Sequence, residues 1–136
     1  MKKRILVIDD SEIMLTRIQR ALAASGDGYE VTATPQVVGN ARHVAKADLV
    51  IIDFHMPGID GGTVLASLKE VAEALRHPCL FYLYTTDPQV ASAFARLGFD
   101  GAITEKGNEE ALVRQVRAIF RMLKMRAMTK PKTTPE

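Results

Sequence analysis

Cysteine and long apolar runs are both scarce in this sequence. The single cysteine, Cys79, has no partner for an internal disulfide, so we expect a chain that works in the reducing cytoplasm. The longest uncharged apolar run is Cys79–Tyr84, whose 6 residues fall far short of the ~20 that a transmembrane helix needs. Only four apolar residues, Ile5–Ile8, separate the basic start from the first acid, which is too few for a signal peptide.

Clustered metal-binding histidines are also absent. The three histidines are far apart and have no cysteine at zinc-ligand spacing, so the sequence disfavours a zinc site; they are His43, His55 and His77. The charged fraction of 25% and a balanced hydropathy exclude a disordered, collagenous or membrane class. A length of 136 residues suits one domain.

The formal net charge of +2 is unevenly distributed along the chain. Residues 1–108 carry 11 basic and 13 acidic side chains, a balance of −2, whereas residues 109–136 carry 7 basic and 3 acidic ones, a balance of +4. The two parts of the chain therefore differ in the charge that they offer to a partner.

Short apolar runs alternate with segments of helical periodicity. We expect strands over Arg4–Ile8, Tyr29–Ala33, Leu49–Ile52, Cys79–Tyr84 and Gly101–Thr104. Helices are expected from Ser11 to Gly26, over Pro35–Lys46, after the loop at residues 57–62, from Asp87 to Gly98, and from Asn108 onward. This alternation predicts an α/β fold in which a five-stranded, doubly wound parallel sheet has helices on both faces.

Acidic and hydroxyl side chains follow the predicted strands. Asp9 and Asp10 follow the first strand, Asp53 the third and Thr85 the fourth. Ligand sites in such folds lie beyond the carboxyl ends of the strands, so these side chains should share one pocket. Carboxylates that converge need a proton or a cation, and oxygen ligands suit Mg²⁺. The sequence therefore predicts a magnesium site at this edge.

The string Asp53-Phe54-His55-Met56-Pro57-Gly58-Ile59-Asp60-Gly61, with Ile5–Asp10 upstream and a hydroxyl residue after the fourth strand, resembles the receiver domains of two-component response regulators. The resemblance covers residues 2 to about 126 and is closest to the single-domain, chemotaxis-regulator type. It implies a flavodoxin-like sheet of order 2-1-3-4-5, with residues 1–128 as receiver domain and 129–136 as a disordered tail or truncated linker.

The resemblance also implies roles. Asp53 would be the phosphoacceptor, taking a phosphoryl group from a histidine kinase or phosphotransfer protein, in a signalling domain rather than an enzyme. Asp10 and Asp53 would bind Mg²⁺ directly, with the backbone carbonyl of His55 as a third ligand and Asp9 helping through water. Thr85 would donate its hydroxyl to a phosphoryl oxygen. A carboxylate is a competent nucleophile in such a site if the metal offsets its charge.

The sequence departs from the receiver pattern near the fifth strand. Receivers usually place a lysine at the end of this strand, and counting from Gly98 and from Leu112 puts Glu105 there. A glutamate would repel a phosphoryl group, and the next residue, Lys106, could reach the site only if the strand bulges or has already ended. The strand-five aromatic that many receivers use as a switch aligns with Ala102, so that readout is expected to be absent.

These departures leave two further readings open. One is a phosphorylation-independent receiver that acts as a docking module. The other is an aspartate-based phosphohydrolase, disfavoured because such enzymes carry a second aspartate where this chain has His55. Basic residues that recur along the last helix predict either a solvated face or a docking surface for a downstream partner; they are Arg114, Arg117, Arg121 and Lys124. The acidic body and the absence of a recognition motif disfavour nucleic-acid binding.

Overall fold

The computed structural model describes residues 3–35, 44, 46–53, 55–56, 59–75 and 79–129, and within these ranges the side chains at 55, 56, 59–64, 75 and 127–129 are not described. The predicted helix over Pro35–Lys46 lies almost wholly outside this part of the chain. No helix in the described part is both long and apolar enough to cross a membrane.

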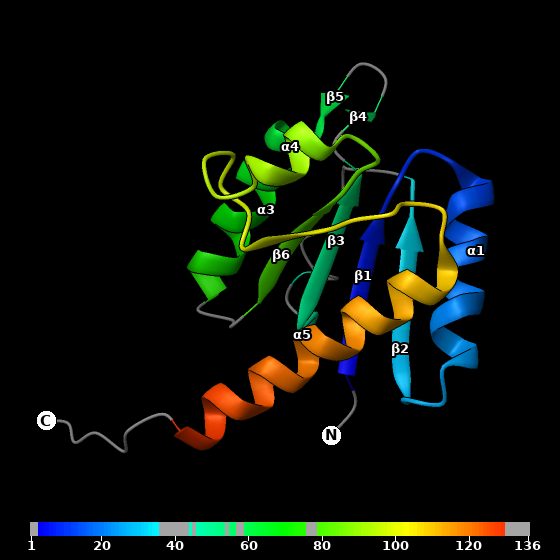
Figure 1. The fold of residues 1–136 in the computed structure, drawn as a ribbon. Coiled ribbons are helices and arrows are strands. Elements are labelled where there is room, and N and C mark those ends of the chain that lie inside the picture. Colours follow the sequence, from blue (N-terminus) through cyan, green and yellow to red (C-terminus); the bar gives the residue numbers. More distant parts are fainter. Residues whose placement is uncertain are drawn as a thin grey trace, which may run out of the picture.

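A five-stranded parallel sheet forms the centre of the molecule (Figure 1). Its strands are β1 (Lys3–Ile8), β2 (Tyr29–Thr34), β3 (Leu49–Asp53), β6 (Leu80–Tyr84) and β7 (Gly101–Ile103), in the order β2-β1-β3-β6-β7. This confirms the predicted doubly wound sheet of order 2-1-3-4-5. All five residues of β3 are buried because helices cover both faces of the sheet.

Two apolar cores lie on opposite faces of the sheet. On one face, α1 (Glu12–Ala24) and α5 (Glu109–Thr129) pack on alternate residues of the central strands, including Ile5, Val7 and Ile51. On the other face, α3 (Gly61–Leu75) and α4 (Pro88–Ser92) cover Leu6, Ile8 and Ile52. Alternate side chains of a strand point to opposite faces, so β1, β3, β6 and β7 contribute to both cores, whereas β2 contributes to the core beneath α1 and α5.

Several element ends follow from capping groups. Ser11 accepts a hydrogen bond from the Met14 amide and begins α1, as its position before the apolar repeat predicts. Asp87 caps α4 through the Gln89 amide, with Pro88 in the first helical position. Asn108 caps α5 through the Ala111 amide.

Several predicted element bounds differ from the structure. The helix expected to reach Gly98 ends at Ser92, because Ala93 leaves the helical region and the chain continues in turns to Gly98 at φ +95. Two short strands, β4 (His55–Met56) and β5 (Ile59–Asp60), form an antiparallel pair in the segment expected to be loop. The last strand ends at Ile103, one residue before the predicted Thr104. The last helix includes Thr129, where the tail was expected to begin, and residues 130–136 lie outside the described part.

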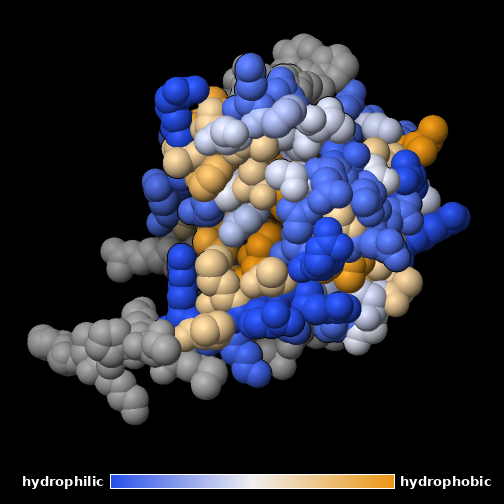
Figure 2. Space-filling view, viewed as in Figure 1, coloured by the Kyte–Doolittle hydropathy of each residue, from blue (hydrophilic) through white to orange (hydrophobic). Residues whose placement is uncertain are grey.

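Hydrophilic side chains cover most of the face shown in Figure 2, and apolar side chains gather near its middle, over β7 and the neighbouring part of α5. Two large apolar side chains in the described part are well exposed: Ile13 on α1 and Met125 near the end of α5.

Candidate phosphoacceptor and metal site

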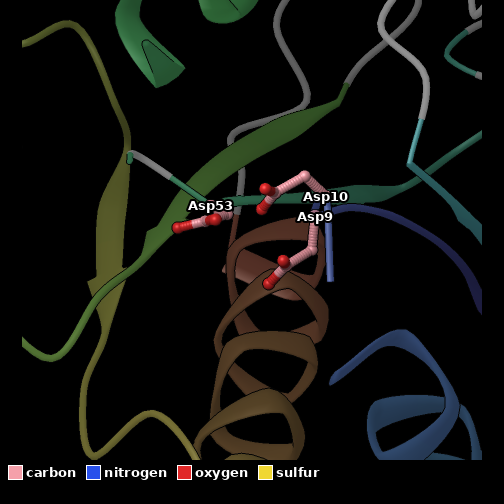
Figure 3. Close-up of side chains that lie close together, drawn as sticks. All are labelled: Asp9, Asp10 and Asp53. Atoms are coloured by element: carbon pink, nitrogen blue, oxygen red, sulfur yellow. The ribbon is translucent and has the colours of Figure 1, made fainter. Parts of the chain in front are cut away.

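Three carboxylates from two neighbouring strands meet at the carboxyl edge of the sheet. Asp9 and Asp10 follow β1, and Asp53 ends β3, which pairs with β1 through Ile8 and Ile52. One carboxylate oxygen from each of the three lies within 4.8 Å of the others, and Figure 3 shows the three side chains gathered around one point. Asp9 and Asp53 are buried, whereas Asp10 is exposed. The sequence-predicted acidic cluster is thus formed in the structure.

Burial dominates the electrostatics of Asp9. It raises the pKa of this carboxyl above its usual value, and the neighbouring charge of Asp53 adds to the rise. The Ser11 amide, which donates to Asp9 Oδ1 at 2.9 Å, and the ammonium of Lys106 oppose the rise and do not cancel it. A positive charge added to the folded pocket would therefore stabilise the ionised carboxylates.

Lys106 supplies such a charge from within the chain. Its Nζ lies 3.0 Å from Asp9 Oδ2 and 3.1 Å from Asp53 Oδ1, and the side chain is 14% exposed. Burial alone would lower the pKa of Lys106, but the hydrogen bonds and charges of the two carboxylates outweigh it and raise the pKa. The ammonium also lies 5.6 Å from the centre of the Tyr84 ring.

The chain reaches this arrangement because β7 ends early. The Gln115 side chain accepts from the Thr104 amide and donates to the Thr104 carbonyl, both at 3.0 Å, so Thr104 is paired with a helix rather than with a strand. Glu105 then adopts a left-handed conformation at φ 58. The fifth strand has therefore already ended before Lys106, which is one of the two conditions under which this lysine could reach the site.

Glu105 does not face the carboxylates. Its side chain is 55% exposed, and Oε2 lies 3.7 Å from the Arg114 guanidinium. Glu105 occupies the sequence position that is usual for lysine. Its left-handed conformation directs the next residue, Lys106, toward the carboxylates instead.

Thr85 lies beside the carboxylates at the end of β6. It is buried, and its hydroxyl accepts a hydrogen bond from the Asp87 amide at 3.0 Å. A pocket of about 320 Å³ is lined by Thr85 and Asp53 together with Met14, Thr86 and Lys106. The predicted hydroxyl and carboxylate thus border one opening.

His55 begins β4, two residues after Asp53, and its side chain is outside the described part. The predicted use of its backbone carbonyl as a metal ligand stays a prediction.

The basic residues of α5 divide into two groups. Arg117 contacts Asp27 at 2.9 Å and donates to the Ser25 carbonyl, and its hydrogen bond lowers the pKa of Asp27. Arg114 pairs with Glu105. Arg121 and Lys124 are both exposed. Two of the four basic residues predicted to form a docking surface, Arg114 and Arg117, therefore already pair with acidic side chains of this chain.

Sequence reasoning missed two residues of α1 that border the site. Met14 lines the pocket, and Arg17 contacts the loop that carries Lys106. Their three-residue spacing puts both on one side of the helix, but only the packing of α1 against α5 shows what that side meets.

Comparison with known proteins gives a consistent family. Residues 5–117 match the sequence model of the response regulator receiver domain. The chain is 29% identical over 122 residues to the alkaline phosphatase synthesis transcriptional regulatory protein PhoP of Bacillus subtilis, covering 89% of this chain and 50% of that protein. It is 32% identical to the transcriptional regulatory protein TcrA of Mycobacterium tuberculosis, covering 87% and 46%. The chain thus spans about half the length of these relatives.

Solved structures share the fold. The chemotaxis response regulator CheY4 of Vibrio cholerae superposes with a TM-score of 0.70 at 20% identity, covering 88% of this chain and 99% of that one. A CheY-like receiver domain protein of Methanospirillum hungatei superposes with a TM-score of 0.71 at 19% identity, covering 92% and 98%.

Proposed function

Because this chain belongs to the response regulator receiver domain family, which comprises phosphoacceptor signalling domains of two-component systems, we propose that Asp53 accepts a phosphoryl group from a phosphohistidine of a histidine kinase or phosphotransfer protein. One observation carries the proposal: Asp53 lies among two further carboxylates and 3.1 Å from the Lys106 ammonium. The receiver domain would occupy residues 1–128, of which the family match covers 5–117.

The pocket fits a hard divalent cation. Receiver domains bind Mg²⁺ at an acidic pocket, and here three carboxylates converge within 4.8 Å with burial already raising the pKa of Asp9. Oxygen ligands with room for water and phosphate suit Mg²⁺. Asp10 and Asp53 would hold the ion directly, with the His55 carbonyl, and Asp9 through water. When bound, the ion neutralises charge on the transferring group.

The residues of the chain would then divide the work of phosphoryl transfer. A carboxylate oxygen of Asp53 attacks phosphorus as the P–N bond to the donor histidine breaks, and the imidazole leaves with the bonding electron pair and takes a proton. The Lys106 ammonium and the Thr85 hydroxyl would pair with phosphoryl oxygens. Such transfer depends on positioning and charge neutralisation more than on acid–base chemistry.

A small phosphodonor tests this directly. With Mg²⁺ and acetyl phosphate, the wild-type chain should gain the mass of one phosphoryl group, measured by mass spectrometry of the intact protein, and EDTA should abolish the gain. Asp53→Asn should show no gain. Asp100→Asn is the matched control, because Asp100 lies at the opposite edge of the sheet, where it accepts from the Phe81 amide, and an asparagine oxygen can still accept there.

The phosphorylation-independent reading would be favoured if no Mg²⁺-dependent modification of Asp53 occurs. Its remaining support is Ala102, a small residue at the position of the usual aromatic switch. Glu105 no longer supports it, since this side chain points to Arg114 and solvent.

The phosphorylated domain would pass its signal to a downstream protein through protein–protein contacts. Arg121 and Lys124 of α5 are exposed and have no described ion pair with an acidic side chain of this chain. These two residues are a candidate docking point for a downstream partner. The names of the relatives refer to transcriptional regulation, but this chain matches half or less of each, so contact with nucleic acid is not carried over. Burial raises the pKa of the half-buried Cys79 thiol to about 12, so we expect this cysteine to be an inert core residue.

A further inference from the structure

The loop that carries Lys106 has an unusual backbone path. Glu105 and Gly107, on either side of the lysine, both have left-handed conformations, at φ 58 and φ 97. The loop has left the sheet after Ile103, so no strand ladder fixes it. Something else must hold the ammonium of Lys106 between Asp9 and Asp53.

Arg17 of α1 contacts this loop at the residue next to the lysine. Its Nη2 donates to the Gly107 carbonyl at 2.7 Å, and its Nε donates to Glu109 Oε2 at 2.7 Å. On the other side of the same residue, the Gly107 amide donates to the Tyr84 hydroxyl at 3.4 Å, a longer and weaker bond. The guanidinium is rigid and planar, so two short bonds from it fix position as well as distance.

We propose that Arg17 is a positioning residue of the phosphoacceptor site: by holding the Gly107 carbonyl and the Glu109 carboxylate, it keeps the Lys106 ammonium between Asp9 and Asp53. This proposal rests on the proposed function for its effect on phosphorylation, but its effect on the pocket does not require phosphoryl transfer.

The contacts argue against a role in stability alone. Arg17 and Glu109 are 44% and 48% exposed, and exposed ion pairs contribute only about 0–1 kcal/mol. The consequence of losing Arg17 should therefore be seen at Lys106 rather than in the free energy of unfolding.

Two opposite effects follow from freeing Lys106. The ammonium pairs with Asp53, which would hold Mg²⁺ directly, and with Asp9, which would hold it through water. A looser lysine therefore competes less, and Mg²⁺ should bind several-fold more tightly. The phosphoryl group, in contrast, loses a well-placed cation, and phosphorylation should slow by about tenfold, as is typical when a supporting contact of a site is removed. A merely structural loss would weaken both.

The experiment is a double-mutant cycle between Arg17→Ala and Lys106→Met, where methionine keeps the apolar stem of the lysine. Mg²⁺ affinity is measured by calorimetric titration, and phosphorylation by acetyl phosphate is followed by mass spectrometry. Arg20→Ala is the matched control, an exposed arginine of the same helix with no described hydrogen bond or ion pair. Urea unfolding checks that each variant is folded. Glu109→Gln, which keeps an acceptor but loses the charge, should give a smaller effect of the same sign.

The proposal predicts that Arg17→Ala tightens Mg²⁺ and slows phosphorylation, and that it changes neither quantity once Lys106 is methionine. Equal effects in both backgrounds, or an effect no larger than that of Arg20→Ala, would overturn it, as would a Lys106→Met variant that behaves like wild type. If the wild-type chain is not phosphorylated, the proposed function fails, and the Mg²⁺ titration alone decides the role of Arg17.

Discussion

Glu105 is the residue whose conformation decides what the neighbouring lysine can do. It is the one non-glycine residue with positive φ in the described part of the chain. A left-handed conformation costs an ordinary residue roughly 1–2 kcal/mol, because Cβ approaches the following carbonyl oxygen. The left-handed conformation of Glu105 turns Lys106 toward Asp9 and Asp53 in spite of this cost.

We predict that Glu105→Gly stabilises the protein by about 0.5–1 kcal/mol, because glycine adopts the left-handed region freely, although it also has more freedom when unfolded. The lost contact with Arg114 is long and exposed, so it subtracts little. Urea unfolding at neutral pH measures the change. Gly107→Ala, at φ 97, should shift stability the opposite way.

The charge of Glu105 should matter little for phosphorylation. In Glu105→Lys, the new side chain would take the same outward direction, and the extent and lifetime of Asp53 phosphorylation should stay close to wild type. A much longer-lived phosphoryl group in this variant would show that the glutamate faces the site.

The carboxylates of the site could be predicted from the sequence, and the lysine could not. Asp9, Asp10 and Asp53 follow apolar runs, and parallel strands bring their carboxyl ends to one edge. Whether Lys106 reaches that edge depends on the sign of one backbone angle and on Gln115, which pairs with Thr104 from eleven residues away. Neither is visible in hydrophobic periodicity.

At the scale of elements, β7 is a short edge strand whose first residue must be small. A Cβ built on Gly101 would lie 2.4 Å from Cε2 of the Tyr82 ring on the neighbouring strand. The ring belongs to the core beneath α5 and has little room to move.

We therefore expect Gly101→Ala to destabilise the protein by about 1–3 kcal/mol through overpacking. Urea unfolding gives the free energy. Tyr82→Leu serves as the rescue background: with the ring gone, the alanine should cost much less. A penalty that is unchanged in that background would show that the clash is not its cause.

Helix starts were more predictable than helix ends. Asp87 and Pro88 act through local chemistry, a side-chain cap and a fixed φ, and α4 begins where they predict. Its end at Ser92 is not local: the apolar residues Phe94 and Leu97 pack on the core from a series of turns, which satisfies the same periodicity as a helix would.

At the scale of the whole molecule, the pocket couples folding to pH. The folded pKa of Asp9 is raised, so the folded chain holds this proton more tightly than the unfolded chain does. The resulting contribution is present below about pH 3.8 and is lost as pH rises through the raised pKa. The pKa of Lys106 is also raised, so its contribution to stability is present below pH 10.5 and is lost as pH rises through the raised pKa.

Asp9→Asn should therefore be more stable than wild type at neutral pH without metal, and this gain should shrink as pH falls below the raised pKa of Asp9. Urea unfolding in EDTA across this range measures the trend. Added Mg²⁺ should stabilise wild type more than Asp9→Asn, because ligands that bind only the folded state stabilise it by mass action. A gain that is constant with pH would assign the effect to packing instead of charge.

The bond between Arg17 and Glu109 joins residues 92 positions apart, and this separation gives the site an order in time. On the ribosome, the carboxylates are made within the first 53 residues, whereas the lysine and the glutamate come from the last third of the chain. Until that part emerges, the three carboxylates of a nascent chain lack the Lys106 ammonium that lies beside Asp9 and Asp53 in the folded protein. Such long-range contacts form late and slowly, so the final helix completes both the fold and the charge balance of its pocket.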